Sequence, residues 1–408
     1  MTSTLHPLHR LWRLLPVERR RRALAHVTSI LAPKASWLAP ACDGRVVVAG
    51  ELSRQSGLGE GARLLLRGLQ THGISAEGVE AGLLASRPSG AEAAFLADKQ
   101  AALLLHVNSP QVPAALLRLG RSAVKGRRIV GYWVWELPKL PPEWQAGVAG
   151  VHEIWTPSHF SAGALEGLKP GCVRVVPYPL ADAQPQPSAL TRASFGWPDD
   201  AVVVLTSFSL ASSFARKNPL AAIAAFRQAF GDRPDRILVM KVSSAQHYEE
   251  DLRRLQTAAG GAANIRFETR NFPMADVHAM TRNADIVLSL HRSEGLGLVP
   301  AEAMLLERPV IATDWSATAE FLTEACGVPV PYRLVPATDD RGVYQVAGAM
   351  WADADVSFAA QALRKLADDS ALRAALGQKA RQSALRAFSP QPLLDAVAAL
   401  TSAPARGR

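Results

Sequence analysis

Short apolar runs alternate with amphipathic segments from about residue 45 onward. The run Arg45–Glu51 contains three consecutive valines and predicts a buried strand, and Glu60–Gln70 has apolar residues at helical spacing. Further apolar strands are expected at Ala101–Val107, Arg128–Val134, His152–Thr156 and Val173–Pro177. Strands that alternate with helices predict parallel β-α-β units, and therefore an open α/β sheet.

A Pro-rich segment divides the chain. Pro177–Ser188 has four prolines in twelve residues and no periodicity, so it predicts an interdomain linker. The alternation then restarts, with a helix at Pro219–Phe230 and strands at Ala201–Thr206, Ile237–Val242, Asn264–Thr269, Asp285–Leu290 and Pro309–Ala312. After about residue 354 the chain is Ala-rich and helical. Two tandem α/β domains are therefore expected, with ligands in the cleft between them.

Charge adds one feature, a basic N-terminal arm over residues 1–40. The chain has 408 residues and a net charge of +9, and the arm contains Arg10, Arg13 and the run Arg19–Arg22 among leucines. Such a segment suits an anionic membrane surface, and a solvated arm is the alternative. The aromatic-and-basic repeats typical of nucleic-acid grooves are missing, so no nucleic-acid partner is expected.

The cysteines and histidines predict neither a disulfide framework nor a metal centre. Cys42, Cys172 and Cys326 are far apart and odd in number. Neither residue type shows the spacing of a zinc site. No run of about 18 apolar residues predicts a transmembrane helix. We expect a cytoplasmic protein, peripheral at the inner membrane face if the arm binds lipid.

The strongest chemical pattern follows the fourth predicted strand of the second half. A turn with Gly295 and Gly297 leads into a helix that opens near Pro300. Such a turn presents free backbone N–H groups and the positive end of the helix dipole, which suits a diphosphate. Glu294 and Glu302 flank this anion site, and their carboxylates can accept hydrogen bonds from sugar and ribose hydroxyls. The alternative is a plain turn beside a helix-favouring Glu.

A pair of cations follows the first strand of the second half. Arg216 and Lys217 precede Asn218 and Pro219, which are expected to cap and open the next helix. Cations disfavour a helix N-terminus, so their position indicates a bound anion. The two charges would neutralise a leaving diphosphate; a solvated charge pair is the alternative.

Two segments of the N-terminal half are candidates for the cleft wall. Gly57 and Gly59 belong to a turn that opens a helix, although its G-x-G-x-G spacing fails the dinucleotide fingerprint. Trp135 and Glu136 end a predicted strand, where an aromatic face and a carboxylate can bind a sugar. The alternatives are a tight turn and hydrophobic packing.

Two histidines lie close to expected strand ends. His106 follows a buried strand, and His291 precedes Glu294 by three residues. Either residue could contact a sugar. A satisfied structural histidine is the alternative for both.

The spacing from Glu294 to Glu302 is E-x7-E, and with its flanks it resembles glycosyltransferase family 4, the retaining enzymes of the two-domain GT-B fold. The flanking segments that share the resemblance are Ala284–Val287 before the motif and Arg308–Asp314 after it. The resemblance implies an α/β GT-B fold, with two tandem Rossmann-like domains, a central cleft and a helical C-terminus. It divides the chain into an acceptor domain at 41–185, a donor-binding domain at 190–385, and a C-terminal helix at 386–408 that packs back on the N-terminal domain.

The resemblance also implies residue roles. In family 4 the first Glu typically contacts the transferred sugar, the second contacts the ribose, and the turn amides contact sugar or phosphate. The implied catalytic set is Glu294, Arg216 and Lys217, and the donor-binding set is Gly295, Leu296, Gly297, Leu298, Glu302 and His291. On the acceptor side the set is Gly57, Gly59, His106, Trp135 and Glu136. Typical members space their Arg and Lys several residues apart, which leaves open which of the two cations does the main work.

The function implied is transfer of a sugar from a nucleoside diphosphate sugar to a hydroxyl, with retention and with neither metal nor other cofactor. The acceptor would be a saccharide or a lipid-linked saccharide, in exopolysaccharide or lipopolysaccharide synthesis. The alternatives are a nucleotide-sugar epimerase and a non-catalytic sugar-binding protein of the same fold. An incubation with donor alone separates the epimerase from the transferase.

Overall fold

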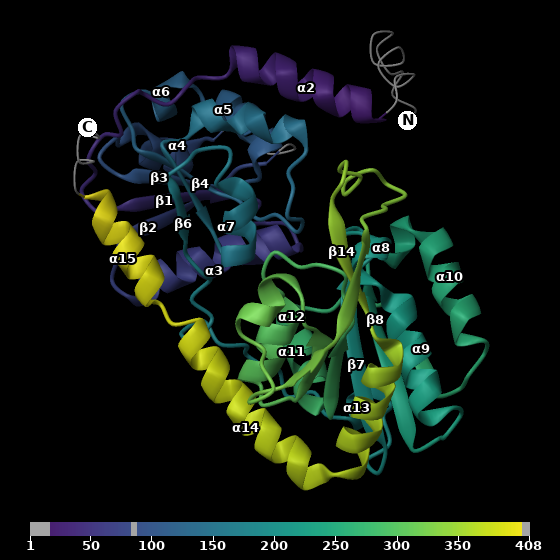
Figure 1. The fold of residues 1–408 in the computed structure, drawn as a ribbon. Coiled ribbons are helices and arrows are strands. Elements are labelled where there is room, and N and C mark those ends of the chain that lie inside the picture. The colour runs from purple at the N-terminus through teal and green to yellow at the C-terminus, as the bar shows by residue number, and fades with distance from the viewer. Residues whose placement is uncertain (1–16, 83–87, 402–408) are drawn as a thin grey trace, which may run out of the picture.

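The first half of the chain forms a parallel six-stranded sheet in the order β2-β1-β3-β4-β5-β6 (Figure 1). The computed structural model describes residues 17–82 and 88–401. The strands of this sheet are β1 (Val46–Gly50), β2 (Ala76–Glu80), β3 (Ala102–His106), β4 (Ile129–Tyr132), β5 (Glu153–Thr156) and β6 (Val173–Val175). The helices of this half are α2 (Val17–Leu31), α3 (Gly57–Thr71), α4 (Gly90–Ala97), α5 (Val112–Leu119), α6 (Arg121–Val124) and α7 (His159–Leu165).

The second half forms another parallel six-stranded sheet, in the order β12-β11-β10-β7-β8-β9. Its strands are β7 (Val202–Ser209), β8 (Arg236–Ser243), β9 (Ile265–Glu268), β10 (Ile286–Ser289), β11 (Val310–Thr313) and β12 (Val328–Val330). An antiparallel hairpin, β13 (Tyr332–Pro336) with β14 (Met350–Ala354), follows β12. The helices are α8 (Phe214–Lys217), α9 (Pro219–Phe230), α10 (Glu249–Ala259), α11 (Met274–Asn283), α12 (Leu298–Leu305), α13 (Val356–Asp368), α14 (Ser370–Ala387) and α15 (Gln391–Leu400).

The predicted α/β class with two Rossmann-like units is confirmed. Central strands such as β1 and β3 are buried along their whole length, as expected for a parallel sheet with helices on both faces. The parallel register puts the carboxyl ends of neighbouring strands at one edge of each sheet. The loops that follow these ends therefore meet in the space between the two units.

Three parts of the fold were missing from the sequence prediction: strand β2, the short edge strand β12 and the β13–β14 hairpin. Strand β2 lies at the edge of the first sheet, and only Ala76 and Val79 of its residues are buried. The β13–β14 hairpin was missed as well, because most of β13 is exposed and has no apolar run. Strands β2 and β13 are thus paired in the sheets although their sequences contain few buried apolar residues.

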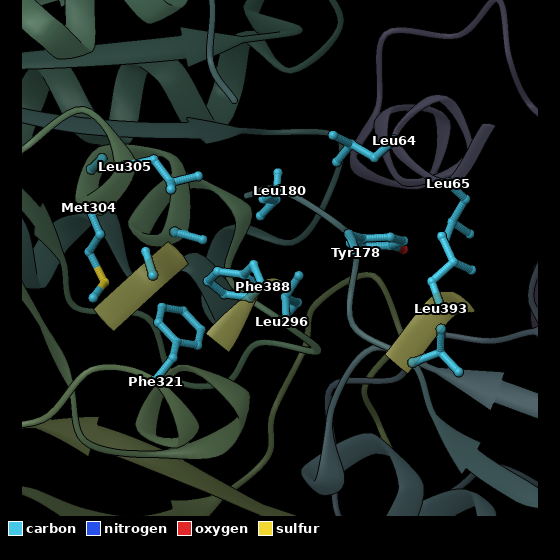
Figure 2. Packing of buried hydrophobic residues seen from close by; sticks show 14 of the residues in the cluster. Leu64, Leu65, Tyr178, Leu180, Leu296, Met304, Leu305, Phe321, Phe388 and Leu393 are labelled. Atoms are coloured by element: carbon cyan, nitrogen blue, oxygen red, sulfur yellow. The ribbon is translucent and has the colours of Figure 1, made fainter. Parts of the chain in front are cut away.

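The last two helices connect the two units. Helix α14 packs beside α12 of the second unit, and the chain then crosses to the first unit, where α15 lies near α3 (Figure 1). Figure 2 shows Leu393 of α15 beside Leu65 of α3, and Phe388 beside Phe321. The backbone N–H of Cys42 donates to the Leu400 carbonyl oxygen at 3.3 Å. One apolar cluster is thus continuous through both units.

The N-terminal arm is described only in part. Arg10 and Arg13 lie outside the described residues, whereas Arg19 and Arg20 belong to α2, which packs against α5. Within residues 17–82 and 88–401, every helix is too short or too polar to cross a bilayer.

Candidate active site

A cavity of about 1220 Å³ opens between the two units. From the first unit it is lined by the start of α3, by the segment Val134–Glu136 after β4, and by Tyr178. From the second unit it is lined by the loops after β7, β8 and β10 and by the start of α12. The carboxyl ends of both sheets thus face one cavity, which is large enough for a nucleotide sugar.

The Glu294–Glu302 segment forms the predicted turn and helix start. Strand β10 ends at Ser289, and α12 begins at Leu298, two residues before the expected start at Pro300. Gly297 has a φ of +94°, and a Cβ atom there would lie 2.7 Å from the Thr318 hydroxyl oxygen. A side chain at this position is therefore both strained and obstructed. The turn brings the first N–H groups of α12 to the cavity.

Four charged side chains meet beside this turn. Lys217 Nζ lies 2.5 Å from one carboxylate oxygen of Glu294, and an Arg216 guanidinium nitrogen lies 3.1 Å from the other. Arg216 also lies 3.6 Å from the Glu136 carboxylate of the first unit. The cluster pairs two cations with two carboxylates across the cleft.

Burial and charge together set the protonation of this cluster. Burial raises the pKa of Glu294, but Lys217 and Arg216 more than offset that effect and hold the pKa well below its usual range. Burial lowers the pKa of Lys217, with Glu294 opposing that effect. Burial raises the pKa of Glu136, which Arg216 only partly offsets. The Glu294 side chain is therefore ionised at neutral pH, so it accepts hydrogen bonds and does not donate a proton.

The cations arise from a different local structure than predicted. Arg216 and Lys217 occupy the last turn of the short helix α8, whose N-cap is Ser213. Asn218 is a left-handed residue, with a φ of +51°, and its side chain donates to the Leu290 carbonyl oxygen at 3.0 Å. Asn218 does occupy the N-cap position of α9, with Pro219 as the first helical residue as predicted, but its side chain makes no capping hydrogen bond to that helix. A cation suits the end of α8, so the helix-dipole argument for a bound anion does not apply.

Most of the predicted donor residues line the cavity. Its wall includes Gly295, Leu296, Gly297, Leu298 and Glu302, together with Glu294, Arg216 and Lys217. Glu302 lies 3.9 Å from His278 Nε2, which is in the same wall. His291 is different: it is 1% exposed and outside the wall, with Nδ1 3.0 Å from the Ser289 hydroxyl oxygen.

The acceptor-side candidates divide into two groups. Gly57, Trp135 and Glu136 line the cavity, whereas Gly59 packs in the first turn of α3 against backbone carbonyl oxygens. The Trp135 indole is 4% exposed and donates to the Lys139 carbonyl oxygen at 2.9 Å, so its ring packs rather than faces the cavity. His106 lies below the wall, with Nε2 3.0 Å from the Tyr178 hydroxyl.

Two of the wall residues that the sequence analysis missed, one charged and one aromatic, lie close to a strand end or to the cation cluster. Lys241 lies two residues before the end of strand β8, is 3% exposed, and donates to the Ser243 hydroxyl at 2.8 Å. Its signal was present, since a lone lysine inside an apolar run is unusual. Tyr344 comes from the loop of the β13–β14 hairpin, and the sequence gives no signal for its approach to the cleft.

In the part of the chain that the structure describes, we find no group of three or more His, Cys, Asp or Glu side chains placed to hold a metal ion.

Comparison with known proteins then gives a family match. Residues 191–383 match the family model described as glycosyl transferases group 1. The matched segment holds the second sheet, the Glu294 turn and both cations. The match supports the coarser prediction, a glycosyltransferase of the GT-B group 1 superfamily.

A curated relative points the same way. The chain is 29% identical over 210 residues to a GDP-mannose-dependent monoacylated alpha-(1-6)-phosphatidylinositol monomannoside mannosyltransferase of Corynebacterium glutamicum. That alignment covers 49% of this chain and 46% of the relative, so the chain spans about half the length of the curated relative it matches.

Solved structures share the fold. The HepE protein of Anabaena, solved with UDP and glucose, superposes with a TM-score of 0.61 at 15% identity, over 87% of this chain and 98% of HepE. WaaG, a glycosyltransferase involved in lipopolysaccharide biosynthesis, gives a TM-score of 0.56 at 16% identity, over 86% of this chain and 99% of WaaG. The GT-B arrangement of the two units is therefore confirmed.

Proposed function

We propose that this protein is a retaining glycosyltransferase of family 4 that transfers a hexose from a nucleoside diphosphate sugar to a hydroxyl acceptor. The observation that carries the proposal is the meeting of Glu294, Arg216 and Lys217 beside the N-terminus of α12, in a cleft between two α/β units. The names of two similar proteins agree, since one depends on GDP-mannose and the other was solved with UDP and glucose.

The donor diphosphate would lie against the α12 N-terminus. The backbone N–H groups of this helix start, with Arg216 and Lys217, stabilise the negative charge that develops on the leaving diphosphate. Both cations are paired with Glu294 in the structure, so an incoming diphosphate competes for them. Glu294 is then released to accept hydrogen bonds from hydroxyls of the transferred sugar, and Glu302 accepts them from the ribose.

The chemical step needs no protein nucleophile. Before the donor binds, the Glu294 carboxylate is paired with two cations, which makes it a poor attacking group, and the neighbouring carboxylate across the cleft, Glu136, itself lies 3.6 Å from Arg216. In a front-face route the acceptor hydroxyl attacks the anomeric carbon, the bond to the diphosphate breaks, and the leaving phosphate oxygen takes the acceptor proton. The protein orients both substrates and stabilises charge without a metal.

The test is turnover of donor and acceptor by matched variants. We expect Glu294→Gln and the double change Arg216→Ala with Lys217→Ala each to lower kcat by about 100-fold or more. Glu324→Gln, an exposed change in the same domain, is the control and should leave kcat unchanged. Unchanged turnover in both site variants would overturn the proposal. Conversion of a donor to its epimer without acceptor would instead establish the epimerase.

We infer further that the acceptor is lipid-linked and that the first unit meets an anionic membrane surface, as in exopolysaccharide or lipopolysaccharide assembly. Large apolar side chains lie exposed on α2 and the loop after it, including Ile30 at 65% and Trp37 at 99%. Residues 1–34 hold seven Arg or Lys residues and one acidic residue. Exposed apolar groups beside excess positive charge are typical of peripheral membrane proteins.

Flotation of the full chain with vesicles tests the membrane part alone. We expect binding to vesicles that contain phosphatidylglycerol and little binding to phosphatidylcholine vesicles. The double change Trp37→Ser with Leu38→Ser should abolish binding, whereas Leu334→Ser, at a 46% exposed site in the second unit, should not. Equal binding of all three proteins, or none by the parent chain, would reject the membrane surface.

A further inference from the structure

The β13–β14 hairpin extends from the second unit to the first. Its residues Tyr344 and Trp351 are buried in the same apolar cluster as Trp133, Trp135 and Trp144 of the first unit. The rings of Tyr344 and Trp135 lie 5.3 Å apart at an angle of 24°, within the range of offset stacking. The hairpin therefore joins the donor-side unit to the segment that follows β4.

A buried carboxylate fixes the hairpin loop to helix α8. Asp339 is 6% exposed, and its carboxylate accepts hydrogen bonds from the backbone N–H of Val343 at 2.9 Å and of Tyr344 at 3.2 Å. It also accepts from the Ser213 hydroxyl at 3.0 Å, while that hydroxyl oxygen accepts from the backbone N–H of Arg216 at 3.2 Å. The backbone of Tyr344 and the backbone of Arg216 are thus tied to each other through two side chains.

The Tyr344 ring also contacts the Arg216 side chain. The guanidinium carbon lies 5.2 Å from the ring centroid, a cation–π distance in a site where Arg216 is 2% exposed. The guanidinium edge donates to the Ser293 carbonyl oxygen at 2.8 Å and to the Ser212 hydroxyl at 2.6 Å. The ring packs against the guanidinium, so it restricts where the charged edge can point.

Tyr344 therefore touches residues from both sides of the cleft. Trp135 belongs to the first unit and Arg216 to the second, and separation of the units would remove the Trp135 ring from Tyr344. We propose that the hairpin is a strap that makes the position of Arg216 depend on contact between the two units, with Tyr344 as the positioning residue. This inference rests on the proposed function in its assignment of Arg216 to the donor diphosphate.

The strap predicts a kinetic signature. We expect Tyr344→Leu to lower kcat by about 30-fold while the donor KM changes by less than about 3-fold. The reason is that a displaced Arg216 mainly loses its ability to stabilise the transition state. Tyr344→Phe keeps the ring and should stay within about 3-fold of the parent kcat. Trp135→Leu should resemble Tyr344→Leu, and the double variant should be no worse than either single one.

Tyr248→Leu is the matched control. The Tyr248 ring lies 4.0 Å below the guanidinium carbon of Arg341, so it forms an equivalent cation–π pair at the same hairpin loop, outside the cavity wall. We expect its kcat to match that of the parent. A similar loss in Tyr248→Leu, additive effects of Tyr344→Leu and Trp135→Leu, or an unchanged kcat in Tyr344→Leu would overturn the strap.

Two measurements need no sugar transfer, so they separate failure of the strap from failure of the proposed function. In Trp135→Leu, backbone amides of α8 should exchange with deuterium faster than in the parent, although the substitution lies in the other unit. In titrations with UDP, GDP and ADP, Tyr344→Leu should weaken binding of the preferred nucleotide by about 10-fold, because its free terminal phosphate carries the charge that develops only on the leaving diphosphate and that the intact donor lacks. Unchanged exchange and binding would reject the strap even if the parent transfers sugar. If exchange becomes faster and nucleotide binding becomes weaker, but the parent protein transfers no sugar, the strap is supported and the transferase is rejected.

Discussion

At the scale of single residues, the two buried histidines have similar pKa values although they lie in different sequence contexts. Burial lowers the pKa of His106 to about 4, and it does the same for His291. Each ring is neutral in the folded protein near pH 6, where an exposed histidine is largely protonated. The folded state thus binds fewer protons than the unfolded state between about pH 4 and 6.5, so stability rises with pH across that window.

His106→Gln should therefore reduce the pH dependence of stability. For the parent we expect His106 alone to cost about 1–2 kcal/mol of unfolding free energy when the pH falls from 7.5 to 5. Urea unfolding of parent and variant at both pH values measures the difference. If the variant loses as much stability on acidification as the parent, His106 is not the titrating group.

The same Gly→Ala substitution is expected to have opposite effects on stability at Gly297 and at Gly57. Gly297→Ala puts a Cβ into a left-handed backbone, 2.7 Å from the Thr318 hydroxyl oxygen, and should cost about 1–3 kcal/mol and most of the activity. A Cβ at Gly57 meets nothing within 4 Å, so Gly57→Ala should be neutral or slightly stabilising. Thermal unfolding and turnover of the two variants test this contrast.

The residues predicted from short local segments lie together in one cavity. The E-x7-E turn and the adjacent cations are short segments, so their clustering in one cavity needed only the fold class. The placement of His291 and Trp135 depended instead on which side of a strand end each side chain faces. That orientation is set by packing partners distant in sequence, such as Tyr344 against Trp135.

At the scale of elements, one helix is capped by the other unit. The Glu320 carboxylate accepts hydrogen bonds from the first N–H groups of α7, from His159 at 3.0 Å and from Phe160 at 2.7 Å. Helix α7 belongs to the first unit and Glu320 to the second. A carboxylate at a helix N-terminus also interacts favourably with the helix dipole.

Glu320→Ala should weaken this contact between the units. We expect a loss of about 0.5–1.5 kcal/mol in the free energy of unfolding, measured in urea, and faster amide exchange at the start of α7. Glu324→Ala, an exposed glutamate in the same segment, serves as the control and should cost less than about 0.5 kcal/mol. Equal losses in the two variants would contradict a specific capping role.

Elements were predictable in proportion to their burial. The predicted bounds of the central strands are close to the observed ones, because these apolar runs are buried on both faces of the sheet. The bounds of helix Pro219–Phe230 are also close, because its apolar residues form one buried stripe. Strand β2 and the β13–β14 hairpin were missed, since their pairing relies on backbone hydrogen bonds and on contacts with distant elements. The hairpin contributes Tyr344 to the cavity, so the missed element and the missed residue have one cause.

At the scale of the whole molecule, α15 attaches the end of the second unit to the first. Leu393 is fully buried in the cluster shared with Leu65 and Tyr178 (Figure 2). A Cβ at Gly68 of α3 would lie 3.5 Å from a Leu393 methyl group, so α3 and α15 are closely packed. This contact holds the chain in place after its second crossing between the units.

Leu393→Ala should open a cavity at this contact. We expect a loss of about 2–4 kcal/mol in the free energy of unfolding. The half-buried neighbour Leu394 provides the comparison, since Leu394→Ala should cost about 1 kcal/mol. Unfolding in urea measures both losses, and similar values would show that α15 is not anchored through Leu393.

The chain passes between the units twice, once through the segment near Pro177–Ser188 and once after α14. Two connections between the units define a single hinge axis. One connection alone would allow the units to rotate in any direction relative to each other. Rotation about that axis is therefore opposed only by contacts between the units such as Glu320 with α7, whereas sliding or separation is also opposed by the two connections. A protease that cuts only the first crossing should leave two fragments that elute together from a sizing column, because α15 travels with one fragment and packs against the other.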